Sequence, residues 1–228
     1  MSTFRHSAVG LAALAREGSL GTRVAEHVRS TSGGGAGPSE VRSWDRSLPI
    51  LANDLIDAGL GSVEMLVEHR LPLTSKRMDA VLAGVDPRTG GDSYVVVELK
   101  QWGAAESWEG DDQLVAVDGM TRRPLLHPVI QVRGYCEYLA DFLGVLEGDE
   151  GAIKGAAYLH NATEQGISDL RALRQDERGR MFTGEHRGEF IDYLRHHLAP
   201  ASGAPAADRF RAAPSGQAGN CSRSLLTS

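Results

Sequence analysis

The spacing of apolar residues divides the chain into helical and strand-like segments. Several stretches repeat apolar residues every three or four positions, which predicts one buried face of an α-helix. These stretches are 7–17, 20–29, 39–59, 127–146 and 185–198. Shorter runs are rich in β-branched residues and lie between turn residues, which predicts strands. These runs are 63–70, 77–83, 93–100, 153–159 and a short edge strand at 181–183.

The most informative of these segments indicate the type of fold. Tyr94 to Val97 is continuously apolar, so the strand at 93–100 is expected to be central and covered on both faces. Pro128 is placed to begin the helix at 127–146, because proline is preorganised for the first helical turn. Over 39–159 the order is α-β-β-β-α-β. We therefore predict an α/β domain with a mixed central sheet flanked by helices.

Composition changes mark the borders of that domain. Residues 30–38 are rich in serine and glycine and are typical of a linker, so 1–37 is expected to be a helical appendage. Residues 102–126 form a charged connection, in which 114–117 followed by Asp118-Gly119 is expected to open a hairpin. The main domain is expected to span 38–200. Residues 201–228 have no periodicity and predict disorder.

Charge and cysteine content exclude some classes of protein. The formal net charge of −6 argues against a protein that binds nucleic acid through one large basic surface. Cys136 and Cys221 form neither a disulfide framework nor a zinc spacing. No apolar run reaches the roughly 18 residues that a membrane-spanning helix needs. We expect a cytoplasmic protein that does not enter membranes.

Two acidic residues and a lysine lie near the ends of neighbouring predicted strands. Asp79 lies on the run at 77–83, a turn at 86–91 reverses the chain, and Glu98 and Lys100 end the next run. Alternation along a strand sends Glu98 and Lys100 to one face. Asp79, Glu98 and the backbone carbonyl of Leu99 are oxygen ligands that suit Mg²⁺ or Mn²⁺. A solvated ion pair is the alternative interpretation of Glu98 and Lys100.

The helix at 127–146 adds two polar residues on one face. Gln131 and Tyr135 are four positions apart and form the pattern Q-x-x-x-Y, which occurs in RecB-type nucleases. A surface amide and a core aromatic residue are the alternative interpretation. Gln131 and Tyr135 lie one helix after Asp79, Glu98 and Lys100, which form the pattern D…E-x-K. This order of elements favours a nuclease site.

Together these residues resemble the PD-(D/E)XK, or restriction-endonuclease-like, superfamily. The chain is more closely similar to the nuclease-like N-terminal region of bacterial proteins that continue into a Schlafen-group-3-type DNA/RNA helicase, a P-loop ATPase. This resemblance covers about 39–209. The segments that carry it are 43–49, 75–81, 96–102, 127–138 and 157–162.

The resemblance implies an α-β-β-β-α-β core and a role for each site residue. Asp79 and Glu98 would be metal ligands and Lys100 the catalytic lysine, with Gln131 and Tyr135 beside the nucleic acid. Family members often add an acidic ligand from the first core helix. Glu40 is the preferred candidate, Asp45 and Asp54 are rivals, and Glu68 is a candidate for supporting the site from the first strand.

Other polar side chains are weaker candidates for contacts with nucleic acid. A local basic lining would use Lys76, Arg77, Arg122, Arg123 and Arg133, although a solvated surface explains each one equally well. Trp102 and Trp108 could stack on bases, with packing as the alternative. The histidines near the C-terminus are expected to be solvated rather than metal-bound; these are His186, His196 and His197.

The sequence thus predicts a Mg²⁺-dependent or Mn²⁺-dependent nuclease acting on DNA, with RNA as the alternative substrate. No G-x-x-x-x-G-K-[ST] motif is present, so we expect that the chain does not carry the ATPase, and a helicase or ATPase is a candidate partner. We expect the segment after residue 210 to reflect truncation or a change of reading frame. A non-catalytic binding or assembly module for a partner ATPase, or an inactive remnant, are the alternatives. The sequence does not indicate an oligomeric state.

Overall fold

The computed structural model describes residues 3–32, 34–71, 74, 76–119, 123–142 and 150–212. It is a mixed α/β fold built on a six-stranded sheet with the order β1-β2-β3-β4-β8-β9. The strands are β1 (Phe4–Ser7), β2 (Glu64–Arg70), β3 (Arg77–Val85), β4 (Asp92–Lys100), β8 (Ile153–Leu159) and β9 (Arg180–Thr183). The first four strands pair antiparallel, whereas β4, β8 and β9 are parallel.

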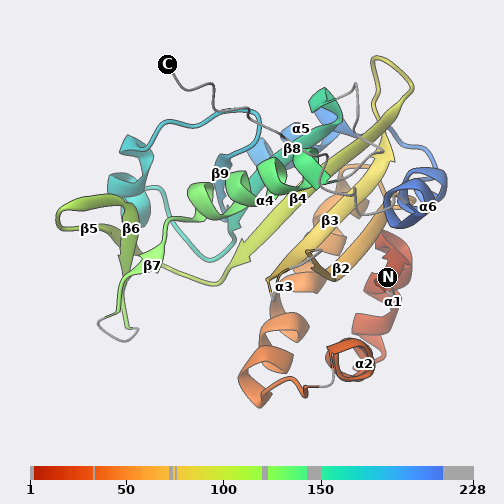
Figure 1. Ribbon diagram of the computed structural model, residues 1–228, viewed down its shortest axis with the longest axis horizontal. Helices are drawn as coiled ribbons and strands as arrows, with labels where there is room; N and C mark the ends of the chain where they lie inside the picture. Colours follow the sequence, from red (N-terminus) through yellow and green to blue (C-terminus); the bar gives the residue numbers. More distant parts are fainter. Residues whose placement is uncertain are drawn as a thin grey trace, which may run out of the picture.

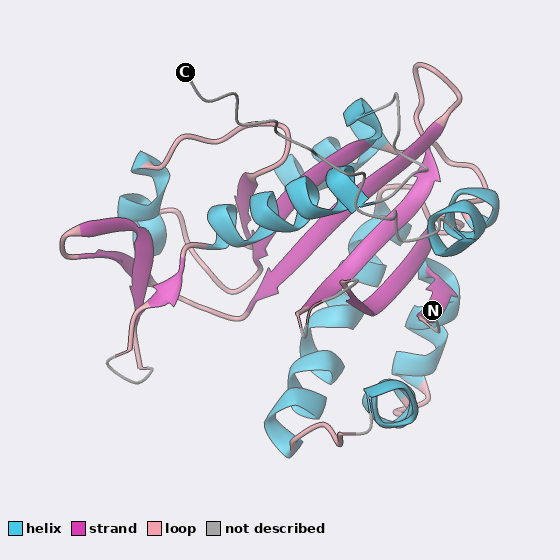
Figure 2. Ribbon diagram, viewed as in Figure 1, coloured by secondary structure: helices cyan, strands magenta, loops and turns pink. Residues whose placement is uncertain are grey.

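Helices cover both faces of this sheet (Figure 1). The helices are α1 (Ala8–Arg16), α2 (Leu20–Ser32), α3 (Pro38–Asp57), α4 (Pro128–Phe142), α5 (Arg187–His197) and α6 (Ala204–Ala212). Residues of α1, α2, α3 and α5 share one apolar core, and residues of α4 and α6 share the other. The sheet is therefore the middle layer between two layers of helices, as the colouring in Figure 2 makes plain.

The central position predicted for β4 is confirmed. Val95 and Val97 pack into the core beneath α3, while Tyr94 and Val96 pack into the core beneath α4. All four side chains are fully buried, because helices cover both faces of the sheet at β4, which lies between the antiparallel β3 and the parallel β8. The order α3, β2, β3, β4, α4, β8 is the one expected from the sequence, and the termini of these elements agree within a few residues.

The connection between β4 and α4 forms a separate three-stranded sheet, which we call the arm. It consists of β5 (Ala105–Trp108), β6 (Asp111–Val117) and β7 (Leu125–Leu126). The expected hairpin after Val117 is present as the β6–β7 pair, but the tighter β5–β6 hairpin was not predicted. Its turn includes Gly110 at a φ of 87°, a conformation that favours glycine. The arm extends away from the main sheet at the left of Figure 1.

The border expected near residue 37 does not separate two cores. β1 pairs antiparallel with β2 and so completes the edge of the main sheet. Apolar residues of α1 and α2, among them Leu11 and Val24, lie in the same core as Leu51 of α3. The N-terminal region is a helical pair as predicted, but it belongs structurally to the sheet domain.

The expectation of disorder from residue 201 onward is wrong for 204–212, which form α6. Phe210 is buried against the ring of Tyr94, and the Tyr94 hydroxyl donates to the Ala206 carbonyl oxygen at 3.0 Å. An ion pair joins Arg209 to Asp92. The buried face of α6 is built largely of alanine, which gives a weak apolar pattern. Residues 213–228 lie outside the described part of the chain.

Within the described residues, the remaining helical segments are the 3₁₀ helices η2 (Glu150–Ala152) and η3 (Gln165–Ala172). Across the residues that the structure describes, no helix combines the length and apolar character needed to cross a membrane.

Candidate functional site

The ends of β3 and β4 bring the predicted acidic residues and the lysine together. Ala80 of β3 pairs with Val97 of β4, so Asp79 stands beside Glu98 in the antiparallel register. The Lys100 ammonium lies 2.6 Å from Glu98 Oε1. The Glu98 side chain is only 4% exposed and that of Lys100 17% exposed. The ion pair is therefore largely withdrawn from water, contrary to the solvated alternative.

Helix α4 adds the predicted glutamine and tyrosine to this group. The Gln131 amide nitrogen donates to Glu98 Oε1 at 2.7 Å and to the Tyr135 hydroxyl at 2.9 Å. Its amide oxygen accepts a hydrogen bond from Lys100 Nζ at 3.1 Å. One side chain thus contacts Glu98, Lys100 and Tyr135, and fixes their relative positions.

Asp79 contacts β4 through the backbone. The N–H of Leu99 donates to Asp79 Oδ2 at 2.7 Å. In a strand, the N–H and C=O of one residue face the same neighbouring strand, so the Leu99 carbonyl also faces the β3 side. Asp79, Glu98 and Leu99, the three ligands proposed from the sequence, therefore belong to one sheet end.

Burial dominates the electrostatics of these groups. It raises the pKa of Asp79, although Lys100 and the Leu99 N–H oppose the shift. Burial and then repulsion by Asp79 raise the pKa of Glu98 to about 8. Burial alone would lower the pKa of Lys100, but the two carboxylates outweigh it and raise that pKa. A second cation would stabilise both carboxylates in their ionised form.

A cavity of about 330 Å³ lies beside Asp79 and Leu99, under the first turns of α3. Within it, Arg77 bonds to Glu40 Oε1 at 2.5 Å and lies 3.3 Å from Glu68 Oε2. Of the three candidates for an additional acidic ligand, Glu40 is the one that lines this cavity. Its carboxylate is paired with the Arg77 guanidinium and is therefore not directed toward Asp79.

The rival candidates point elsewhere. Asp45 accepts a 2.8 Å hydrogen bond from the Gly21 N–H and so joins α3 to α2. Asp54 is buried and paired with Arg187 at 2.5 Å, which links α3 to α5. Both carboxylates have structural partners away from Glu98 and Lys100.

Glu68 has an unusual backbone. Its φ of 51° is the one positive value among the described residues other than glycine, and it falls inside β2. The register of β2 with β3 skips this residue, and its carboxylate accepts a hydrogen bond from Trp44 Nε1 at 2.6 Å. Burial and repulsion by Asp79 raise its pKa to about 7. Such local strain is common at functional sites.

A polar cluster next to Lys100 was missed as a functional feature. The Gln101 amide nitrogen donates at 2.9 Å to both Ser43 Oγ and Ser47 Oγ of α3. Ser47 Oγ also shares a 3.0 Å hydrogen bond with His160 Nε2, just after β8. Asn161 donates to the Gln101 carbonyl at 3.1 Å. The cluster joins α3 to the ends of β4 and β8.

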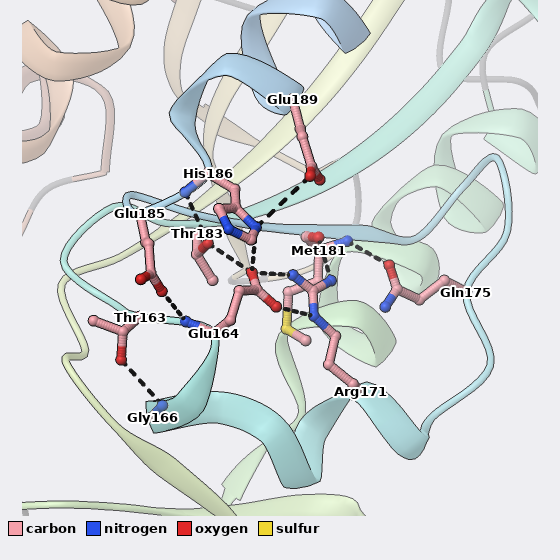
Figure 3. A network of polar contacts seen from close by, with 10 residues as sticks. All are labelled: Thr163, Glu164, Gly166, Arg171, Gln175, Met181, Thr183, Glu185, His186 and Glu189. Atoms are coloured by element: carbon pink, nitrogen blue, oxygen red, sulfur yellow. Dashed lines mark hydrogen bonds and ion pairs between the residues drawn. The ribbon is translucent and has the colours of Figure 1, made fainter.

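A second network of hydrogen bonds and ion pairs holds the loop that follows β8 (Figure 3). Both Glu164 carboxylate oxygens accept from Arg171, at 3.0 and 2.6 Å, and the Thr183 hydroxyl donates to the same carboxylate at 2.7 Å. The guanidinium also donates to the Met181 carbonyl at 2.7 Å. Glu164 thereby joins η3 to β9, close to where His160 and Asn161 enter the cluster around Gln101.

The weaker sequence candidates have varied surroundings. Trp102 lies beside the site, with the Lys100 ammonium 5.2 Å from its ring centroid, whereas Trp108 belongs to the arm.

Arg133 pairs with Asp176 at 3.0 Å. Arg123 is exposed, and Arg122 lies outside the described residues. His186 lies 3.7 Å from the carboxylates of Glu164 and Glu189. His197 is buried, so the expectation that it is solvated is wrong.

The donor atoms at the sheet end fit an oxygen-binding cation that keeps most of its water. Among the described residues, no three His, Cys, Asp or Glu side chains are grouped so that they could hold a metal ion. Asp79, Glu98 and the Leu99 carbonyl provide two charged oxygens and one neutral oxygen, which suits Mg²⁺ better than a metal that needs a closed protein cage.

A cleft of about 460 Å³ opens at this sheet end. Asp79, Glu98 and Lys100 line it, together with Ser43 of α3 and Asp118, which follows β6 of the arm. The cleft therefore gives an external ligand access to all three charged residues.

No protein-family model, curated protein or solved structure matches the chain.

Proposed function

We propose that the chain is a metal-dependent nuclease of the restriction-endonuclease-like fold, which hydrolyses phosphodiester bonds in DNA, with RNA as the alternative substrate. One observation carries the proposal: Glu98, Lys100 and Gln131 form a buried, mutually bonded group beside Asp79 at the mouth of a cleft. The order of α3, β2, β3, β4, α4 and β8 and the mixed sheet also support it, since the family resemblance implies that order.

Each residue has a role that follows from its position. Asp79, Glu98 and the Leu99 carbonyl would hold Mg²⁺ or Mn²⁺, which offsets negative charge on the reacting phosphate and lowers the pKa of a bound water. Lys100 is a compact cation that can orient the attacking water and bind a phosphate oxygen. Gln131 keeps the Lys100 ammonium and the Glu98 carboxylate in place through its two amide atoms.

A specific observation favours the non-catalytic alternative. The Glu40 carboxylate is paired with Arg77 and is therefore not presented as a further ligand. A nucleic-acid-binding or assembly module that serves a partner helicase or ATPase would need the fold and the cleft but no bound metal. The chain's net charge of −6 requires that any contact with phosphates be local in either case.

Cleavage assays on single- and double-stranded DNA and RNA separate these functions. Wild type should cleave at least one substrate with Mg²⁺ or Mn²⁺ and none in EDTA. Lys100→Ala should abolish cleavage. Lys154→Ala is a matched control. Lys154 lies on β8 outside the site, and its ammonium pairs with Glu177 at 3.2 Å. Binding without cleavage by wild type under every condition would favour the non-catalytic module.

A further inference from the structure

A third, largely apolar cavity of about 690 Å³ runs along α4, beside the candidate site. Ile130, Gly134 and Tyr138 of α4 form one wall of this groove. Leu71 and Lys76, from the connection between β2 and β3, line it as well, and Leu126 of β7 is half-exposed at its edge. The groove has the size and apolar lining of a small-molecule pocket.

Gly134 has no structural reason to be glycine. It lies in the middle of α4 and is exposed, its φ is not positive, and an added Cβ would meet no atom within 4 Å. A glycine there costs helix stability relative to alanine. By contrast, a Cβ on Gly155 would lie 2.1 Å from the Arg178 carbonyl oxygen, so packing explains that glycine. The absence of a side chain at Gly134 leaves this wall of the groove open.

The groove shares two residues with the candidate site. Gln131 and Tyr135 line it, and they are the residues that bond to Glu98 and to each other at 2.7 and 2.9 Å. A ligand in the groove therefore contacts the side chains that position Lys100. At the other wall Lys76 is exposed, and its ammonium makes no ion pair with any residue in the described part of the chain.

We propose that the groove binds an unpaired nucleobase of the strand whose phosphate lies at Lys100. This inference rests on the proposed function. A nucleobase has apolar faces, which suit the side chains of Ile130 and Tyr138, and polar edges, which suit the Tyr135 hydroxyl, since it accepts from Gln131 and can still donate its own hydrogen. Lys76 can contact a neighbouring phosphate. A base that is paired and stacked in a duplex cannot enter such a cavity, so the groove selects single-stranded or unpaired nucleotides.

Binding in EDTA tests this proposal without requiring cleavage. The probe is a single-stranded DNA oligonucleotide that carries 2-aminopurine, compared with the same strand in a blunt duplex. Gly134→Phe fills the groove. Gly188→Phe is the matched control, because Gly188 is also an exposed helical glycine whose added Cβ would meet no atom within 4 Å, but it lies on α5. Circular dichroism verifies the fold of both variants.

Gly134→Phe should weaken single-strand binding by about 5- to 150-fold, the loss expected for one stacked base. It should also abolish the change in 2-aminopurine fluorescence, whereas Gly188→Phe should bind within about twofold of wild type. If Gly134→Phe does not fold, Gly134→Leu replaces it. Unchanged single-strand binding by a folded groove-filling variant overturns the proposal. So does the absence of any binding by wild type.

Cleavage assays in Mg²⁺ keep this inference distinct from the proposed hydrolysis. Wild type that binds the base but cleaves no substrate would contradict the nuclease function while the groove proposal stands. A Gly134→Phe variant that cleaves single strands as fast as wild type, with unchanged affinity, would contradict the groove proposal while the nuclease function stands.

Discussion

The backbone N–H of Leu99 donates a 2.7 Å hydrogen bond to the carboxylate of Asp79. This contact joins β3 to β4 beyond their last paired residues, Ala80 and Val97. It also holds a partly buried carboxylate beside Glu98, where burial raises the pKa of both acids. The sheet end thus carries more negative charge than Lys100 alone neutralises, a condition that costs stability unless a second cation binds.

Asp79→Asn should therefore abolish cleavage yet leave the metal-free protein as stable as wild type, or more stable by about 1 kcal/mol. Asparagine can still accept the Leu99 hydrogen bond through its amide oxygen, while the like charge next to Glu98 disappears. Urea unfolding at neutral pH in EDTA measures the difference. Lys100→Ala is the contrasting variant, because it removes the cation 2.6 Å from Glu98 and leaves the buried carboxylates without their partner, so it should destabilise the fold. Equal losses of stability in both variants would contradict this account.

Metal should stabilise wild type and fail to stabilise Asp79→Asn. A cation that binds only the folded state adds about 2.7 kcal/mol when its concentration is a hundred times its Kd. The thermal midpoint in Mg²⁺ or Mn²⁺, compared with EDTA, reports this shift without requiring a substrate. A shift of the same size in wild type and Asp79→Asn would place the cation elsewhere.

Gln131 and Tyr135 should act as a unit. Gln131→Met keeps the length of the side chain but removes its contacts with Glu98, Lys100 and Tyr135, so kcat should fall by about 10- to 100-fold. Tyr135→Phe removes one acceptor from Gln131 and should have a smaller effect. The double variant should resemble Gln131→Met alone, with a coupling energy of about 0.5–1 kcal/mol. Additive effects would show that the two residues act independently.

The order of the core elements could be predicted from the sequence because each has a strong local pattern. The unbroken apolar run at Tyr94 to Val97 indicates a central strand, and Pro128 marks the start of α4. Gln131 and Tyr135 could be paired because both lie on one helix. Helix α6 was missed because its buried face, Ala206, Ala207 and Phe210, contains a single large side chain.

Contacts between distant segments could not be predicted in the same way. The ion pair of Glu40 with Arg77 depends on how α3 crosses the ends of β2 and β3. The positive φ of Glu68 occurs where the pairing of β2 with β3 omits one residue pair. A glutamate at that position gives no local signal for such a conformation. Likewise, the bond between Ser47 and His160 joins residues 113 positions apart.

Ser47→Ala tests whether that bond supports the site. The change removes the shared partner of Gln101 and His160, so it should lower the free energy of unfolding by about 1–3 kcal/mol. It should also lower kcat several-fold, because α3 loses its bond to His160 and one of its bonds to Gln101. Ser43→Ala is the matched control: Ser43 is exposed, and its backbone carbonyl still accepts from Gln101 at 3.2 Å. That variant should stay within about 0.5 kcal/mol of wild type.

Two buried histidines should make the protein less stable in mild acid. Burial lowers the pKa of both His69 and His197 to about 4, against an ordinary value of 6.5. A base with a lowered pKa in the folded state binds its proton more readily when unfolded. The stability that each neutral histidine contributes is therefore fully present above pH 6.5. This contribution is lost as the pH falls from 6.5 toward 4, by about 1.4 kcal/mol per pH unit for each histidine.

His197→Phe isolates one of these contributions. The Nδ1 atom of His197 is buried without a hydrogen-bond partner, and its ring packs against Tyr193 with centroids 4.6 Å apart, a contact that phenylalanine can keep. Carboxylates with raised pKa values, such as Glu98, oppose the histidine effect in wild type, so the informative quantity is the difference between variant and wild type. That difference should favour the variant increasingly from pH 6.5 to pH 4.5, by about 2 kcal/mol at pH 5. Urea unfolding of both proteins across this pH range measures the difference. A difference for His197→Phe that does not change with pH would contradict a neutral, buried His197.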